Sequence, residues 1–416
     1  MNRLCHLTPS AAVALVLVSL ALPPARGVTI DWVTVGNPGN ANDTTGYGAV
    51  NYEYRIAKHE VTIQQYTDFL NAVAATDPYS LYNTGMATNL NVAGISRSGA
   101  SGGYTYSVIN NGGSSGNRPI TYVSWFSAAR FANWMHNGQG SGSTETGAYR
   151  ISTGQITAAS RTGGVNTYVL SAPSTLSVGD QVAVTGLGGT AFNVSGIVTS
   201  VAESQFTIAN TNSNAVATGT GRMTGASATA ASNAAFYIPT ENEWYKAAYY
   251  SPVKGGVGSP GYYAYATQRD SAPGNLVGSG VNQANYSTAA GFSVTQSSTY
   301  FSSQNYLTDV GAFTNSASYY GTFDQSGSVS EWNEGITGTS LGSLGARRGA
   351  QGGSWDFYAA SLSSSSRSPQ SPSAYGVSLG FRLASPVPVP EPSTWAMAAG
   401  GLASAAWATF RRRKRA

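Results

Sequence analysis

Cysteine, histidine and charged residues are scarce in this chain of 416 residues. Its one cysteine, Cys5, lies in the N-terminal apolar stretch, so residues 28–416 contain no disulfide, no thiolate metal site and no cysteine nucleophile. Only His59 and His136 follow that stretch, which excludes a site built from three histidine ligands. A chain without disulfides must be stabilised by its apolar core, by a metal ion, or by both.

The first 27 residues have the pattern of a secretory signal peptide. Arg3 opens a short polar start, residues 11–22 are apolar, and the small residues Ala25 and Gly27 suit cleavage before Val28. Residues 1–27 are therefore expected to be removed and are excluded from the fold.

The C-terminus has three consecutive parts. Pro390, Glu391 and Pro392 precede an apolar run at 395–410, about 24 Å long as a helix at ~1.5 Å per residue, and five cations follow at 411–415. Those cations are expected to stay in the cytoplasm, which places the body of the protein outside the inner membrane. An ordinary C-terminal anchor is the alternative. The tail resembles the PEP-CTERM sorting signal of Gram-negative bacteria. That resemblance implies transient anchoring through 386–416, cleavage by an exosortase, and a final place at the cell surface or outside the cell.

Removing both ends reverses the net charge. Two of the 22 basic residues lie in 1–27 and five in the tail, whereas only one of the 18 acidic residues is lost. The remaining 15 basic and 17 acidic residues give a net charge of −2. No electrostatic footprint for nucleic acid remains, and none is expected as a partner.

Short strands and capped helices are predicted in the rest of the chain. Residues 30–35 and 52–61 alternate apolar and polar side chains, which favours strands. Thr62, Ser124 and Thr240 each precede a helical apolar pattern and are suitable N-caps, the last in a capping box with Glu243. Residues 81–116, rich in Gly, Asn and Ser, are predicted to be a long loop.

Six motifs resemble those of the formylglycine-generating enzyme (sulfatase-modifying factor) family, in family order. They lie at 58–66, 118–134, 237–248, 327–332, 348–355 and 380–382. Ser328 and Ser330 depart from the family pattern Gly-Asn-Val-Trp-Glu-Trp. The resemblance implies an irregular α+β fold related to C-type lectins.

One segment lies outside the family pattern. Stretches of period-2 alternation at 167–170, 178–186, 196–201 and 205–209 are separated by turns, which is typical of a small all-β module. We therefore expect a sulfatase-modifying-factor-like domain in two parts, 28–152 and 234–385, with an inserted β domain at 153–233.

The resemblance carries little of the family chemistry. Active members bind copper through two cysteines, and the matching positions here are near Phe357 and Leu362. A related branch holds iron with three histidines, which this chain lacks. Catalytic residues and an organic cofactor are therefore not assigned. An enzyme with non-cysteine chemistry, related to non-haem iron, is the alternative.

The resemblance also implies a structural Ca²⁺ site. Its ligands would be the side chains of Asp324 and Glu331 and the carbonyls of Gly327 and Val329, and oxygen ligands presented by a turn suit Ca²⁺. The predicted function is that of an exported, catalytically inactive binding or structural module of the envelope or extracellular matrix. Its candidate partners are extracellular polysaccharide or an envelope protein, besides the exosortase.

Overall fold

The computed structural model describes residues 27–338 and 345–387. The predicted signal peptide up to residue 26 and the sorting tail from residue 388 lie outside these ranges. Within them, no helix has the length and apolar character needed to cross a membrane.

Three helices longer than two turns begin where the sequence predicts. They are α1 (Ile63–Val73), α3 (Trp125–His136) and α4 (Glu241–Tyr249). Thr62 accepts a hydrogen bond from the Gln65 amide (3.2 Å), and Thr240 and Glu243 form the reciprocal capping box. Each cap satisfies an amide that has no partner within the helix, an effect of about 1 kcal/mol.

Helices α1 and α3 bury one continuous aromatic core. The rings of Tyr66, Phe69, Phe131 and Trp134 contact one another at centroid distances of 5.3–6.1 Å. Phe381 packs against Phe131 at 5.4 Å, so the last family motif closes the core of the first two.

Small sheets surround this core. Strand β2 (Tyr54–Ala57) pairs with β1 (Trp32–Val35) and with β19 (Ala384–Pro386), which joins the two ends of the described chain. Strand β16 (Ser330–Thr337) lies between β17 (Arg347–Gln351) and β18 (Leu379–Gly380). The remaining two-stranded sheets pair β12 (Tyr250–Ser251) with β13 (Gly261–Tyr262) and β14 (Ser287–Thr288) with β15 (Gly291–Phe292).

The predicted long loop at 81–116 is partly structured. It contains helix α2 (Gly85–Thr88) and the antiparallel strands β3 (Ile95–Ser98) and β4 (Thr105–Val108). These elements are too short to show a clear period in the sequence, because one turn or four residues sample each pattern only once or twice.

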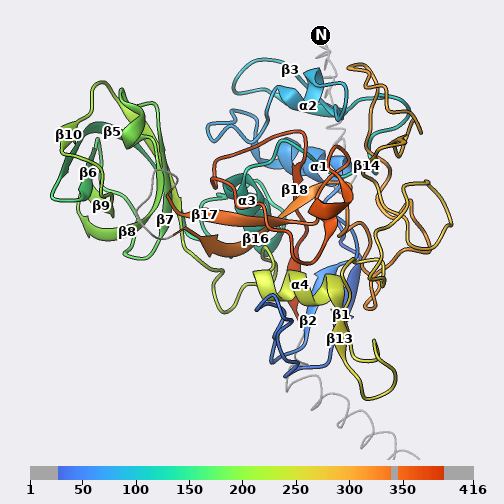
Figure 1. Cartoon of the computed structure of the whole chain (residues 1–416). Helices are drawn as coiled ribbons and strands as arrows, with labels where there is room; N and C mark the ends of the chain where they lie inside the picture. The colour runs from blue at the N-terminus through green and yellow to red at the C-terminus, as the bar shows by residue number, and fades with distance from the viewer. Residues whose placement is uncertain (1–26, 339–344, 388–416) are drawn as a thin grey trace, which may run out of the picture.

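Residues 151–226 form a lobe of their own at the left of Figure 1. Its strands are β5 (Ile151–Thr162), β6 (Val165–Leu170), β7 (Gln181–Thr185), β8 (Ser195–Ala202), β9 (Gln205–Ala209), β10 (Ala215–Val216) and β11 (Gly221–Ala226). The sheet closes on itself, because β5 pairs with β11 on one side and with β6 on the other. A separate apolar cluster fills it, centred on Tyr168 stacked on Phe206 at 4.9 Å. That this lobe folds independently stays a prediction.

The two connections of the lobe meet at one place. The Tyr149 hydroxyl accepts a hydrogen bond from the Ile238 amide (2.9 Å), and the Ser227 amide donates to the Arg150 carbonyl (3.0 Å). The segments before and after the lobe therefore lie side by side, as expected for an insertion into one connection.

Candidate functional site

The predicted calcium ligands lie in the turn that leads into β16. Asp324 and Ser328 have left-handed backbone conformations, with φ of 64° and 63°, and Gly327 has φ of 105°. A Cβ at Gly327 would lie 2.4 Å from the Asn285 carbonyl oxygen, so only glycine fits there. That carbonyl accepts a hydrogen bond from the Ser328 amide (2.8 Å), which holds the turn against segment 284–286.

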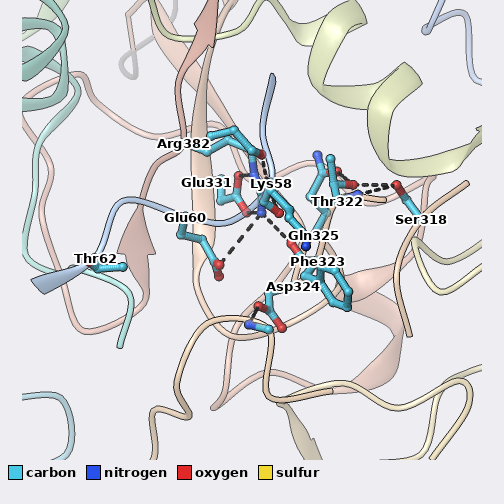
Figure 2. A network of polar contacts seen from close by, with 12 residues as sticks. Lys58, Glu60, Thr62, Ser318, Thr322, Phe323, Asp324, Gln325, Glu331 and Arg382 are labelled. Carbon is cyan, nitrogen blue, oxygen red and sulfur yellow. Dashed lines mark hydrogen bonds and ion pairs between the residues drawn. The ribbon is translucent and has the colours of Figure 1, made fainter. Parts of the chain in front are cut away.

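Arg382 lies at the centre of this region (Figure 2). Its guanidinium binds Glu331 through two hydrogen bonds, Nε to Oε2 at 2.5 Å and Nη2 to Oε1 at 2.6 Å. The other donors reach the carbonyls of Ala57 (2.9 Å), Lys58 (3.2 Å) and Phe323 (2.8 Å). Both side chains of the ion pair are fully buried. Arg382 thus connects strand β2, the turn and the last family motif.

Glu331 has a further partner. The indole nitrogen of Trp244 in α4 donates to its Oε2 at 2.8 Å. Three donors therefore already satisfy this carboxylate, and a metal ion would have to compete with the guanidinium for it.

Glu60 differs from Glu331 in having no hydrogen-bond partner. Its side chain is fully buried, neither carboxyl oxygen is hydrogen-bonded, and its Oε2 is 3.9 Å from Arg382 Nη2. Asp324 is half-buried and accepts a hydrogen bond from the Gly311 amide at 2.6 Å. Glu60 and Asp324 flank the guanidinium in Figure 2, so three carboxyl groups surround one cation.

Burial changes the protonation of these groups. Desolvation, together with the neighbouring Asp324 and Glu331, raises the pKa of Glu60 well above its usual value. Desolvation also raises the pKa of Asp324 to about 6, despite the hydrogen bond from Gly311 and the attraction of Arg382. Excess negative charge in this region is relieved by a bound proton or by a cation.

The fit of Ca²⁺ to this region is partial. Within residues 27–338 and 345–387, no group of three or more His, Cys, Asp or Glu side chains is arranged to hold a metal ion. Ligation would therefore depend on the Gly327 and Val329 carbonyls, with Asp324 and Glu60 as the carboxylates that still have free oxygens. The four-ligand site with Glu331 stays a prediction.

The positions that match the family cysteines lie away from Arg382. Leu362 is fully buried and packs with Ala284 and Tyr286. One of its methyl carbons would be 2.7 Å from a Cβ at Gly353, so the leucine packs directly onto the Gly-Gly turn. An apolar side chain thus fills the second cysteine position, and Phe357 occupies the first.

The two remaining histidines are engaged in different places. His59 packs on Phe323 at 5.4 Å, and burial together with Arg382 and Lys58 lowers its pKa to about 4. His136 ends α3 and accepts a hydrogen bond from the Ala235 amide at 3.0 Å.

Glu60 and Arg382 were not selected from the sequence, although both lie in family motifs. The available signal was weak, because a glutamate at a strand end and an arginine after an aromatic residue are ordinary surface patterns. Their burial depends on contacts between segments about 320 residues apart.

Comparison with known proteins agrees with the motifs. The profile of the sulfatase-modifying factor enzyme 1-like domain matches residues 47–387, and that of the PEP-CTERM protein-sorting motif matches residues 388–414. Curated proteins give no match.

Solved structures similar to this chain include three with low identity. They are CarF (17% identity, 86% of this chain and 99% of that chain, TM-score 0.41), Treponema denticola variable protein 1 (16%, 88% and 98%, 0.39) and PvdO from Pseudomonas aeruginosa (13%, 86% and 92%, 0.34).

The family match covers most of the chain, and the sorting motif indicates export. The chain belongs to the sulfatase-modifying factor enzyme 1-like family and ends in a PEP-CTERM sorting motif.

Proposed function

We propose that this protein is a non-catalytic family member that binds a component of the cell envelope or extracellular matrix. The observation that carries the proposal is the filled cysteine site. Phe357 and the buried Leu362 stand where the family chemistry needs two thiolates, and no other cysteine follows Cys5. Thiolate ligation of copper therefore has no donor atoms here.

The export route supports a role outside the cytoplasm. The sorting motif at 388–414 implies recognition by an exosortase, and the chain without its two ends is nearly neutral. A weakly charged protein with many exposed tyrosines and amides is suited to contacts with sugars or proteins rather than with highly charged polymers.

Two measurements on protein from the host test this proposal. Intact mass is expected to show loss of residues 1–27 and of the cationic end at 411–415. Oxygen consumption with a cysteine-containing peptide and copper is expected to be absent, while envelope fractions of the host retain the protein. Copper-dependent turnover of the peptide would refute the non-catalytic role.

A variant with both cysteines restored gives the matched control for that assay. Phe357→Cys with Leu362→Cys supplies two thiols at the family positions. Copper binding by this double variant and not by the parent is the expected result, because the parent lacks only the donor atoms. Equal copper binding by both proteins would locate the metal elsewhere.

We also propose that the turn before β16 binds Ca²⁺ as a structural ion. Asp324, Glu331 and the carbonyls of Gly327 and Val329 are the proposed ligands, and Glu60 is added because both of its buried oxygens lack partners. The excess of carboxyl groups over the one guanidinium supports a divalent cation here.

A further inference from the structure

A strip of uncharged side chains lies on the surface beside helix α2, away from the Arg382 region. It consists of Asn89, Leu90, Asn91, Tyr122, Tyr300 and Phe301. Leu90 is 43%, Tyr300 54% and Phe301 52% exposed. Large apolar side chains exposed together commonly mark a binding surface.

Hydrogen bonds join the strip across the fold. The Asn91 side chain accepts from the Tyr300 hydroxyl and donates to the Phe301 carbonyl (2.9 Å). The Asn89 side chain donates to the Tyr122 hydroxyl (2.9 Å). Residues 89–91 therefore hold both tyrosines, which come from segments about 180 residues apart, in one arrangement.

A column of stacked rings supports Tyr300 from below. Tyr300 stacks on Tyr306 at 5.9 Å and 13°, and Tyr306 stacks on Trp355 at 5.0 Å and 1°. Tyr306 and Trp355 are buried. One face of Tyr300 is thus fixed against the core, and about half of its surface is open to solvent. A ring held in this way loses little conformational entropy when a ligand stacks on it.

Tyr122 is held in an unusual conformation. Its φ is 60°, which is rare for a bulky side chain, and the nearest atom of its ring would be only 2.5 Å from a Cβ at Gly85. Gly85 therefore makes room for the ring. Tyr375, which is 58% exposed, packs against Tyr122 at 6.4 Å and extends the strip.

We propose that this strip binds a neutral polysaccharide, an inference that rests on the binding function proposed above and names its ligand class and site. Aromatic faces accept the C–H faces of sugar rings, and amide and hydroxyl groups exchange hydrogen bonds with sugar hydroxyls. None of the six side chains is charged, so the strip offers no partner for a phosphate, carboxylate or ammonium group.

Affinity electrophoresis of the full chain tests the strip. Galactomannan and dextran serve as neutral polymers and alginate as the anionic one. Galactomannan or dextran is expected to retard the protein, and alginate is not. The double variant Tyr300→Ala, Phe301→Ala should weaken retardation about tenfold, because a few aromatic side chains dominate such contacts.

Two further variants keep the test specific. Tyr300→Phe retains the ring and should retain most of the binding. Tyr319→Ala removes a tyrosine that is 40% exposed and packs on Tyr320, away from the strip, and should bind as the parent does. All of these changes are at exposed positions, and unchanged thermal melting confirms that the variants are folded.

Each outcome decides something different. Binding of galactomannan or dextran that the double variant retains refutes the strip and leaves the binding function standing. Preference for alginate refutes the neutral ligand. A parent that binds no polymer but captures an envelope protein through the strip replaces a sugar by a protein, and this also refutes the inference. A parent that binds neither polymers nor host envelope fractions refutes the inference together with the proposed function.

Discussion

Arg382 neutralises Glu331 where neither side chain reaches water. Burial alone lowers the pKa of Arg382, but the ion pair and the hydrogen bonds with Glu331 raise it overall. Taking both charges out of water is costly, so the pair adds little compared with an apolar pair of the same size. Removing one partner is different, because the other is left buried and uncompensated.

Arg382→Met is therefore expected to lower the free energy of unfolding by about 3–5 kcal/mol. Glu331→Gln in the same chain should recover part of that loss, because no buried charge remains unpaired. Urea denaturation measures both. Arg55→Met, at a partly exposed arginine that binds Ser385 and Pro386, is the control, with an expected change below about 1 kcal/mol. Equal effects at Arg55 and Arg382 would show that burial of the pair is unimportant.

Strand β16 also carries Glu334, which holds the end of the insertion. Glu334 accepts hydrogen bonds from the Tyr149 hydroxyl (2.6 Å) and the Ala230 amide (2.7 Å). Arg348 of β17 donates to the carbonyls of Ala228 (2.6 Å) and Ser227 (3.3 Å) and lies 3.7 Å over the Trp125 ring. The segment 227–230 is thus fixed to the family domain by two buried ionisable residues.

The state of Glu334 predicts a pH dependence of stability. Burial raises its pKa from 4.5 to about 7, although Tyr149, Arg348 and Ala230 oppose the rise. Between these values the folded chain binds more protons than the unfolded chain. The contribution of Glu334 is therefore full below pH 4.5 and is lost as the pH rises through about 7.

Glu334→Gln should remove this part of the pH dependence, up to about 3 kcal/mol between pH values of about 5 and 8. Urea denaturation at both pH values measures it, with Glu203→Gln in an exposed turn of the lobe as the control. If the parent and Glu334→Gln lose the same stability on going to the higher pH, Glu334 does not titrate in this range.

The lobe of β5–β11 is expected to be removable. Joining Ile151 to Ser227 deletes the closed sheet but keeps the segment that Glu334 and Arg348 hold. Because the two ends already lie side by side, the closing loop costs little, and one cooperative thermal transition should remain. Joining Ile151 to Tyr237 instead also removes Ala228 and Ala230, and that variant should be less stable by about 1–3 kcal/mol, because buried donors and acceptors lose partners. Loss of cooperativity in the first variant would mean that the lobe and the family domain share one core.

At the scale of the whole molecule, stability without disulfides depends on few strong contacts. The described chain joins its two ends in one sheet, β1–β2–β19, and folds its family motifs around Arg382. A bound cation would add stability to the same region by mass action.

Calcium is expected to raise the melting temperature, and a chelator to lower it. At about 100 times the Kd, the added stability is about 2.7 kcal/mol. Asp324→Asn and Glu60→Gln should each weaken this response, whereas Asp309→Asn, at an exposed neighbouring acid, should not. Glu331→Ala is unsuitable as a test because it also leaves Arg382 unpaired. An unchanged melting temperature with and without chelator would exclude the site.

Much of this protein follows from short stretches of its sequence. The caps Thr62, Ser124 and Thr240 and the four predicted stretches of the lobe were recognised because hydrogen bonds and periodic burial act between near neighbours in the chain. The targeting ends and the absence of thiolates needed composition alone. The family followed from the order of six motifs.

Only the tertiary structure decided which groups meet. Glu331 and Arg382 are 51 residues apart, Tyr300 and Asn91 are 209 apart, and strand β5 closes the lobe through partners at both of its edges. Such pairings leave no period in the sequence, because a buried charge and an exposed charge are the same letter. Whether a side chain is desolvated depends on what the rest of the chain places around it, and that sets the protonation of Glu60 and the support beneath Tyr300.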